Sequence, residues 1–393
     1  MARRYDIVLF GATGFAGGLT AEYLAANGPA RLTWALAGRS PSKLAHVRDR
    51  LAQISPGCAE LPLIRADISD EGSLRDLAEA ARVMVSTVGP YLRYGEPLVA
   101  ACAAAGTDYL DLTGEPEFVD TMYLRYHQRA MSTGARLIHS CGFDSIPADL
   151  GVLFTVNQLP EGVPLKVSCL ARVGGSISGG TWHSTVETLG RLREARSVAR
   201  KRAELERVLA PLAAGRHVHG VVGRPRNEEL ANGWIVPAPM IDPQTVLRSA
   251  RALDRYGPDF TYSHYLVTGD LPATVRLAGT VGGIIALAHW RTGRDLLLRL
   301  RSPGEGPSGE KRARSFFRSR FVADSPGLKQ RLITEVSGGD PGYGETAKML
   351  AESALCLAFD EVEIGGGQVT PAVALGRRLI DRLSRAGINF HVV

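Results

Sequence analysis

The chain opens with an apolar run, Tyr5–Phe10 (YDIVLF), that leads directly into the glycine-rich segment GATGFAG. Gly11, Gly14 and Gly17 are spaced as GxxGxxG, and apolar residues recur at helical spacing immediately after them. A strand, a glycine-rich turn and a helix in this order are typical of a Rossmann dinucleotide site, in which the helix N-terminus faces the pyrophosphate. There the first glycine allows the turn, the second lets backbone approach the phosphates and the third permits close helix packing. The segment predicts an α/β fold that begins with a dinucleotide-binding unit.

Strand and helix patterns continue to alternate through the first third of the chain. We expect strands at Leu32–Ala37, Leu61–Ala66, Val83–Val88, Tyr109–Leu112 and Arg136–His139, with helices at Pro41–Gln53, Leu74–Ala80 and from Pro116. Repeated βα units of this size favour a parallel sheet with helices on both faces. Residues 1–142 are accordingly predicted to form a Rossmann domain.

The pattern changes after residue 142. Segments that read as strands are expected to be antiparallel members of one open sheet, at Leu165–Arg172, Phe260–Val267, Ser315–Val322 and Leu328–Val336. Long helices are expected at Thr181–Leu209 and Gln244–Tyr256. The pattern of residues 143–340 therefore predicts a second domain of the α+β type, built on an open mixed or antiparallel sheet. We expect this domain to bind the substrate or to form a dimer interface. Residues 341–393 are expected to form helices that pack back on the Rossmann domain.

Composition excludes several classes of protein. With 393 residues, 45% hydrophobic and 22% charged, the chain is an ordinary globular one, and its five scattered cysteines form no zinc-binding pair, so no metal site is expected. Asp6 interrupts the N-terminal apolar run too early for a signal peptide, and the longest apolar stretch, Val281–Ala288, is too short to span a bilayer. We expect a cytoplasmic protein and leave peripheral membrane contact open. The net charge of +6 suits an anionic partner, but dispersed basic residues argue against nucleic acid.

The residues that follow the second strand indicate which nicotinamide cofactor binds. An NAD enzyme usually has a carboxylate there, whereas this chain reads AGRSPSK. Arg39, Ser40 and Lys43 offer two cations and a hydroxyl to a 2′-phosphate, which predicts NADP(H). The alternative is that Arg39 is an ordinary surface residue.

Other residues are expected along the same cofactor because they follow the strands of the sheet. Asp67 would lie near the adenine, or else cap the next helix. The remaining predicted contacts are Thr13, Phe15, Thr87, Val88, Gly89, Cys141 and Gly142.

Several longer motifs together resemble one family. GATGFAG, AGRS, STVGPYLRYG, PLVAACAAAGTDYLDLTGE, CGFDSIPADLG, GDPGYGETAKMLAESAL and TPAVALG are similar to those of saccharopine dehydrogenase-like oxidoreductases, and most similar to actinobacterial trans-acting enoyl reductases. The resemblance implies NADP(H), a second domain like that of saccharopine reductase, and an α,β-unsaturated thioester held on an acyl carrier protein or polyketide synthase. The resemblance does not decide the oligomeric state, and a homodimer is one possibility.

Enoyl reduction needs a donor for the thioester oxygen and a proton for the α-carbon. Tyr91 and Tyr94, in the loop after the fourth strand, are the predicted catalytic residues, and simple aromatic packing is the alternative for each. Asp111 and Glu115 are interpreted as structural, and the alternative for Asp111 is that it orients a tyrosine or a water. Asp144 is interpreted as capping the helix that Pro147 begins.

Three hypotheses for function follow. The first is an NADPH-dependent enoyl reductase in lipid or polyketide synthesis, with the apolar segment Ala278–Trp290 near the acyl chain and the basic segment Lys311–Arg314 near a carrier protein. The second is a saccharopine reductase-like imine or amino-acid dehydrogenase, which would need arginines such as Arg172 on its substrate carboxylates. The third is an inactive NADP-binding sensor or scaffold.

Overall fold

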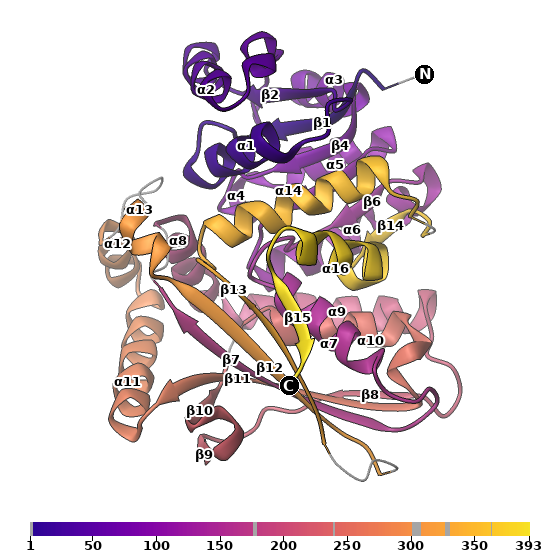
Figure 1. Cartoon of the computed structure of the whole chain (residues 1–393), viewed down its shortest axis with the longest axis vertical. Helices are drawn as coiled ribbons and strands as arrows, with labels where there is room; N and C mark the ends of the chain where they lie inside the picture. The colour runs from indigo at the N-terminus through magenta and orange to yellow at the C-terminus, as the bar shows by residue number, and fades with distance from the viewer. Residues whose placement is uncertain (1–2, 176–178, 239, 301–307, 327–330, 363) are drawn as a thin grey trace.

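A computed structural model describes all residues except 1–2, 176–178, 239, 301–307, 327–330 and 363. Figure 1 shows a parallel sheet with its helices in the upper part and a second, larger sheet below it, with the C-terminus beside the second sheet. The predicted fold class is confirmed: a Rossmann-like parallel sheet is joined to a second domain on a mixed sheet.

The first sheet has seven parallel strands in the order β14-β6-β5-β4-β1-β2-β3. Its strands are β1 (Tyr5–Phe10), β2 (Trp34–Gly38), β3 (Leu63–Arg65), β4 (Ala81–Ser86), β5 (Asp108–Asp111), β6 (Arg136–Ile138) and β14 (Gly367–Val369). The order reverses between β1 and β4, and ligands of open α/β sheets bind at such a reversal, outside the carboxyl ends of the strands.

Helices cover both faces of this sheet. They are α1 (Phe15–Asn27), α2 (Pro41–Ile54), α3 (Glu71–Ala80), α4 (Tyr91–Tyr94), α5 (Glu96–Ala105), α6 (Pro116–Thr133) and α14 (Gly344–Phe359), with a 3₁₀ turn at Pro56–Glu60. Alternate residues of β1 point to opposite cores: Ile7 and Leu9 pack with α14, whereas Val8 and Phe10 pack with the α5 and α6 side. A strand buried on both faces reads as a continuous apolar run, which is why its bounds were predicted correctly.

The second sheet has the order β15-β13-β12-β7-β11-β10-β9, with β8 also paired to β11. Its strands are β7 (Leu165–Gly174), β8 (His217–Gly220), β9 (Arg226–Glu228), β10 (Gly233–Pro237), β11 (Asp259–Gly269), β12 (Phe316–Asp324), β13 (Leu332–Gly338) and β15 (Asn389–Val392). The expectation that its members are all antiparallel is wrong, because β7 pairs with β11 in parallel. A helical crossover separates these two strands in the chain, and such a connection permits parallel pairing.

The remaining helices belong to the second half of the chain. They are α7 (Ile146–Val156), α8 (Gly179–Leu189), α9 (Leu192–Leu209), α10 (Asp242–Ala252), α11 (Leu271–Ala288), α12 (Arg291–Arg299), α13 (Gly309–Ala313), α15 (Pro371–Ala374) and α16 (Gly376–Arg385), with 3₁₀ turns at Glu229–Ala231 and Asp254–Tyr256. The predicted single helix Thr181–Leu209 is two helices, because α8 ends before Gly190 and α9 starts after Arg191. The segment after residue 340 contributes a strand to each sheet as well as helices.

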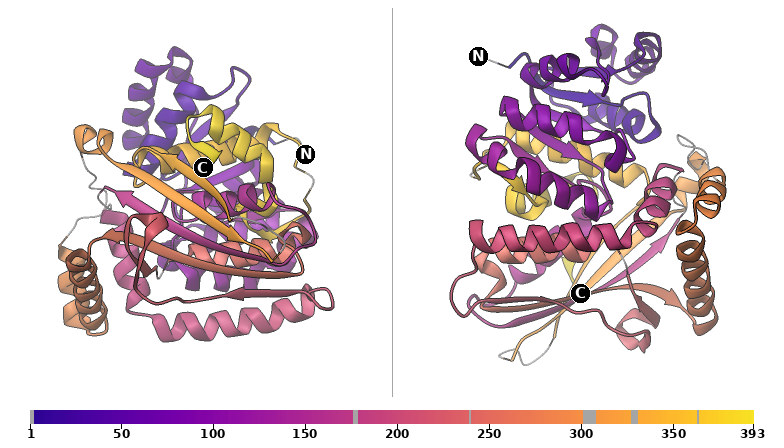
Figure 2. Two further views of the ribbon diagram at one scale, coloured as in Figure 1. Left: turned by 60° about the horizontal axis from the view of Figure 1, so that its bottom comes forward. Right: turned by 180° about the vertical axis from the view of Figure 1, so that it is seen from behind.

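Helix α11 lies at the edge of the molecule in both views of Figure 2. It is longer than the apolar run Val281–Ala288, and only Thr274 and Ala288 of its side chains are buried. Among the described residues it is the one helix long and apolar enough to cross a membrane, and length and composition alone are weak support for that role. The apolar surface of α11 therefore faces away from the main core.

Candidate active site

The glycine-rich turn has the geometry of a dinucleotide site. Gly11 has a φ of +95°, and a Cβ there would lie 2.7 Å from the Thr87 Oγ1 atom. A Cβ on Gly17 would lie 2.2 Å from the Gly11 carbonyl oxygen, so α1 can approach the turn only with glycine at that position. A Cβ on Gly14 would meet nothing closer than the Gly11 oxygen at 3.4 Å, an ordinary contact. The fold itself therefore does not require glycine at position 14, and a ligand that lies against the backbone there would explain why the residue has no side chain.

The N-terminus of α1 faces this space without a side-chain cap. Gly14 is the N-cap residue and makes no capping hydrogen bond, and Thr13 beside it is exposed. Unpartnered first-turn amides attract phosphate groups, since they carry the positive end of the helix dipole.

Two side chains from the second half of the chain reach the same end of α1. The Tyr343 ring stacks edge-on to the Phe15 ring with centroids 4.7 Å apart, and the Arg312 guanidinium carbon lies 5.9 Å from the Phe15 centroid. The Nε atom of Arg312 is buried and has no hydrogen-bond partner among the described residues. Sequence analysis assigned the basic segment Lys311–Arg314 to a carrier protein; Arg312 of this segment lies beside Phe15, and Lys311 and Arg314 are exposed.

The residues predicted for the 2′-phosphate lie together after β2. Arg39 and Lys43 are exposed, and the described residues offer neither side chain an acidic partner within ion-pair distance. Ser40 caps α2, since its Oγ accepts from the Lys43 amide at 3.4 Å. The hydroxyl of Ser40 thus has a structural role that sequence analysis did not assign.

Asp67 follows β3, the strand next to β2, but does not cap α3, because Asp70 accepts the Gly72 and Ser73 amides there. The Asp67 carboxylate accepts from the amide and the hydroxyl of Ser69, at 3.0 and 2.8 Å. These two hydrogen bonds lower the pKa of Asp67, and the charge of Arg39 adds to the effect. Asp67 is therefore an anion close to Arg39, at the adenosine end of the predicted site.

The other predicted contacts divide into two groups. Thr87, Val88 and Gly89 continue from β4 next to the Gly11 turn, and the Thr87 Oγ1 donates to the Gly11 carbonyl at 3.2 Å. Cys141 is fully buried, and its Sγ donates to the Ile138 carbonyl. A Cβ on Gly142 would lie 2.7 Å from Leu112, so these last two residues face the interior rather than the groove.

The two predicted catalytic tyrosines differ in accessibility. Tyr91 is 5% exposed, and its hydroxyl donates to the Ser86 carbonyl at 3.1 Å while it accepts from the Leu112 amide at 3.2 Å. That hydroxyl is already engaged inside the protein, and burial raises the pKa of Tyr91 well above its usual value. Tyr94 is 39% exposed at the end of α4. Of the two, Tyr94 is the one whose hydroxyl is open to a substrate.

Carboxyl groups gather around the same loop. Glu115 is fully buried and accepts from the Tyr91 amide at 3.0 Å, the Leu92 amide at 2.7 Å and the Ser184 hydroxyl at 2.7 Å. Glu115 therefore ties the Tyr91–Tyr94 loop to α8, and burial raises its pKa. Asp111, interpreted as structural, accepts from the amides of residues 113 and 140 and pairs with His139.

Asp144 is the functional candidate that sequence analysis missed. It makes none of the capping hydrogen bonds expected of it, and Ser145, the N-cap residue of α7, contacts the Thr245 hydroxyl instead. The Asp144 carboxyl carbon lies 3.4 Å from the Cβ position of Gly114. Burial, reinforced by the charge of Glu115, raises the pKa of Asp144 to about 6. A partly exposed carboxyl with such a pKa is suited to proton transfer near neutral pH.

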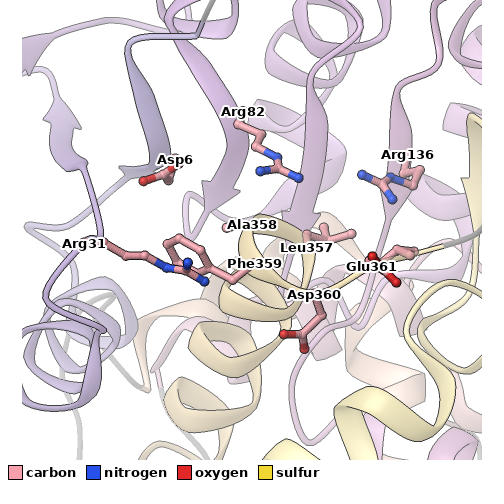
Figure 3. A pocket seen from close by; sticks show the side chains of 10 residues that line it. Asp6, Arg31, Arg82, Arg136, Leu357, Ala358, Phe359, Asp360 and Glu361 are labelled. Carbon is pink, nitrogen blue, oxygen red and sulfur yellow. The ribbon is translucent and has the colours of Figure 1, made fainter.

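A polar cavity at the opposite end of the first sheet is not the cofactor site. It has a volume of about 680 Å³, and Figure 3 shows Asp6, Arg82 and Arg136 on its walls, near the amino ends of β1, β4 and β6. Nucleotides bind at carboxyl ends of parallel strands. The charge of Arg136 is already paired, because its guanidinium lies 2.5 Å from the Asp108 carboxylate.

Comparison with known proteins agrees with this geometry. Residues 7–138 match the family model described as the saccharopine dehydrogenase NADP binding domain. A trans-acting enoyl reductase of Mycobacterium tuberculosis is 39% identical over 416 aligned residues, which cover 98% of this chain and 97% of that protein. This chain belongs to the saccharopine dehydrogenase-like family. A trans-acting enoyl reductase of Mycobacterium ulcerans is 37% identical with the same coverage.

One solved structure shows the same overall fold. Apo saccharopine dehydrogenase (L-glutamate-forming) from Saccharomyces cerevisiae aligns with 99% of this chain and 100% of its own, with a TM-score of 0.58 and 11% identity. The family and its NADP-binding domain make this protein an NADP-dependent oxidoreductase, with NADP(H) as its cofactor.

Proposed function

We propose that this protein is an NADPH-dependent enoyl reductase that acts in trans on an acyl thioester bound to a carrier protein, a polyketide synthase or coenzyme A. The observation that carries the proposal is the pair of carboxyl groups, Asp144 and Glu115, whose charges act on Tyr91 in the loop that also carries the exposed Tyr94. Near full-length similarity to proteins named trans-acting enoyl reductases supports the same reaction.

The proposed cofactor contacts follow the groove from one end to the other. Arg39 and Lys43 would hold the 2′-phosphate, with Asp67 near the adenosine. The α1 N-terminus behind Gly14, with Thr13 and Phe15, would hold the pyrophosphate, and Arg312 would approach it from the second domain. The segment Thr87–Gly89 would lie toward the nicotinamide. Cys141 and Gly142 are left out of this set because they face the interior.

When bound, NADPH supplies a hydride to the β-carbon of the enoyl group. The protein must then stabilise negative charge on the thioester oxygen and protonate the α-carbon. We assign the proton to the Asp144 carboxyl, because its raised pKa keeps much of it protonated at slightly acidic pH. Tyr94 is the proposed hydrogen-bond donor to the oxygen. Tyr91 holds the loop through Ser86 and Leu112 and takes no part in the chemistry.

The same carboxyl groups disfavour the imine reductase hypothesis. Above the pKa of Asp144, a substrate with carboxylates would be repelled by Asp144 and Glu115 unless arginines offset them. Arg172, the arginine proposed for that role, donates to the Ala231 carbonyl at 2.8 Å instead. A neutral enoyl thioester meets no such repulsion.

The surface of α11 and α12 supports contact with a large partner. Val275, Trp290, Leu296 and Leu300 are all more than half exposed there. Monomeric soluble proteins rarely expose large contiguous apolar patches, and such patches commonly bind another protein or a membrane. We favour the partner synthase over a membrane, since the proposed substrate is delivered by one.

The test is to supply purified protein with NADPH and either a 2-enoyl pantetheine thioester or a 2-oxo acid with a primary amine, and to follow NADPH fluorescence. We expect NADPH oxidation with the thioester alone. Oxidation with the keto acid and amine alone would favour the imine reductase. Oxidation with neither, while NADPH still binds, would favour the inactive sensor or scaffold.

A further inference from the structure

A second cavity lies between the two halves of the chain, away from the proposed cofactor groove. It has a volume of about 550 Å³ and is bounded by α6, α9, α10 and the β14–α15 segment, which lie together in the right half of Figure 1. None of the proposed cofactor contacts lines it. Cavities of 300–1,000 Å³ commonly hold small organic ligands.

The inner wall presents a histidine nitrogen with no partner. His139 is 4% exposed, and its Nδ1 lies 2.7 Å from the Asp111 carboxylate. Edge contacts with the rings of Tyr109 and Phe118 fix its orientation. Its Nε2 is buried and has no hydrogen-bond partner in the part of the chain that the structure describes. When the Nδ1–H group of the neutral imidazole donates to Asp111, Nε2 is left as a hydrogen-bond acceptor.

Gln368 provides a second acceptor on the same wall. It is 8% exposed, and its Nε2 donates to the Val119 carbonyl at 3.0 Å. Its Oε1 is buried and unpartnered within the described ranges. Buried polar atoms are nearly always satisfied, so two orphan acceptors in one cavity indicate a ligand that donates hydrogen bonds.

Among the described residues, the inner end of the cavity carries no free positive charge. His127 also lines it, and burial lowers the pKa of that imidazole to about 4, which keeps it neutral at physiological pH. Arg202 lies 3.2 Å from Asp120 and 2.6 Å from Glu206, and Arg248 also pairs with Asp120. These two arginines are therefore neutralised within the wall.

The rim differs from the interior. Arg207 and Arg251 line the cavity and are exposed, and neither has an ion-pair or hydrogen-bond partner for its side chain among the described residues. Between rim and inner wall the lining is largely apolar: Val119, Leu212, Ile364, Val369, Pro371 and Val373. Positive charge at the mouth, apolar walls and hydrogen-bond acceptors inside define an amphipathic site.

We propose that this cavity binds a small amphipathic anion whose apolar body carries a hydroxyl or amide donor at the end opposite its negative charge. The anionic group pairs with Arg207 and Arg251, the aliphatic part lies against the apolar wall, and a hydroxyl donates to Gln368 Oε1. A primary amide has two N–H donors and can bond to His139 Nε2 as well. This site is separate from the proposed reductase site, so it stands whether or not the enzyme reduces enoyl thioesters.

The test uses calorimetry on the full chain with three probes of equal length: 10-hydroxydecanoate, decanoate and 1,10-decanediol. We expect 10-hydroxydecanoate to bind about tenfold more tightly than decanoate, which lacks the donor, and than the diol, which lacks the charge. The double variant Arg207→Ala/Arg251→Ala should lower the affinity for the acid to that for the diol and leave diol binding unchanged. Arg200→Ala, an exposed arginine of α9 outside the cavity, is the matched control.

Gln368→Leu removes the acceptor while nearly keeping the side-chain volume, and should abolish the preference for 10-hydroxydecanoate over decanoate. NADPH titration of each variant reports whether the fold and the cofactor groove remain intact. Absence of binding by all three probes to the wild type would overturn the proposal. Equal binding of the acid and the diol, or an unchanged affinity in the double arginine variant, would overturn it as well.

Discussion

Replacing Asp144 by asparagine tests the proposed chemistry most directly. Asparagine keeps the size of the side chain but has no acidic proton to give to the α-carbon. A positioned general acid contributes about 10²–10⁴-fold to rate. We therefore expect kcat to fall by about 10²–10³-fold in the variant, with NADPH affinity nearly unchanged because Asp144 is not among the proposed cofactor contacts.

The pH dependence follows from the raised pKa of Asp144. An acid must be protonated to donate, and the pKa of about 6 predicts that kcat of the wild type falls as the pH rises through that value. Two pH units above it, about one Asp144 carboxyl in a hundred remains protonated. In Asp144→Asn this limb should be absent. Asp76→Asn, which changes an exposed carboxyl on α3, serves as the control. A variant that retains both the wild-type rate and the wild-type pH profile would refute the assignment.

Five further substitutions test the cofactor site and the fold. Gly14→Val should abolish NADPH binding in titrations yet leave the melting temperature nearly unchanged, because only the Gly11 oxygen lies near the new Cβ. Gly17→Val should lower the melting temperature, since its Cβ would lie 2.2 Å from that oxygen. Arg39→Asp should weaken NADPH binding at least about tenfold and leave NADH binding little changed, because only NADPH carries the 2′-phosphate; an unchanged preference would contradict that role. Arg312→Ala should weaken both cofactors alike, as expected of a contact with the shared pyrophosphate, and a selective loss of NADPH would argue against it. Asp149→Asn should reduce the pH dependence of stability in denaturant titrations: burial raises the folded-state pKa of Asp149 to about 7, above its unfolded value, so the wild type should lose stability as the pH rises from about 4 to 7, and an equal slope in the variant would refute this.

Local sequence patterns were sufficient to predict the strands and helices of the first sheet. Tyr5–Phe10 was predicted with its observed bounds, because a strand covered on both faces is a continuous apolar run that ends at a glycine. The start of the helix at Pro116 could also be predicted, since proline is favoured in the first turn of a helix. The carboxyl-end positions of Thr87 and Asp67 followed from the order of the strands.

Features that depend on distant partners could not be predicted in the same way. β7 and β11 pair in parallel because of how the intervening chain folds, which the alternation in either strand does not encode. Asp144 was interpreted as a helix cap because its sequence neighbours fit a cap, and its raised pKa depends on burial in the tertiary structure and on Glu115. The orphan atoms of His139 and Gln368 share a cavity only after β14 joins β6.

The second domain contacts the loop that carries the proposed catalytic residue Tyr94, and this would connect the proposed partner contact with catalysis. Ser184 of α8 donates to Glu115, which in turn accepts the Tyr91 and Leu92 amides. Glu187 of the same helix pairs with Arg93 at 2.5 Å, so α8 holds the loop at two points.

Helix α8 is itself held by the elements that carry the exposed apolar surface. Val186 of α8 packs with Ala288 of α11 and Leu297 of α12 in a small hydrophobic cluster separate from the main cores. Trp182 of α8 also donates its indole N–H to the Leu297 carbonyl at 2.6 Å. A synthase bound to α11 and α12 would therefore be one layer of packing from the helix that positions the loop of Tyr91 and Tyr94. Closely packed side chains pass small displacements on to their neighbours. Binding of a partner to the α11 and α12 surface could therefore shift α8 and, with it, the Tyr91–Tyr94 loop at the proposed site of proton and hydride transfer.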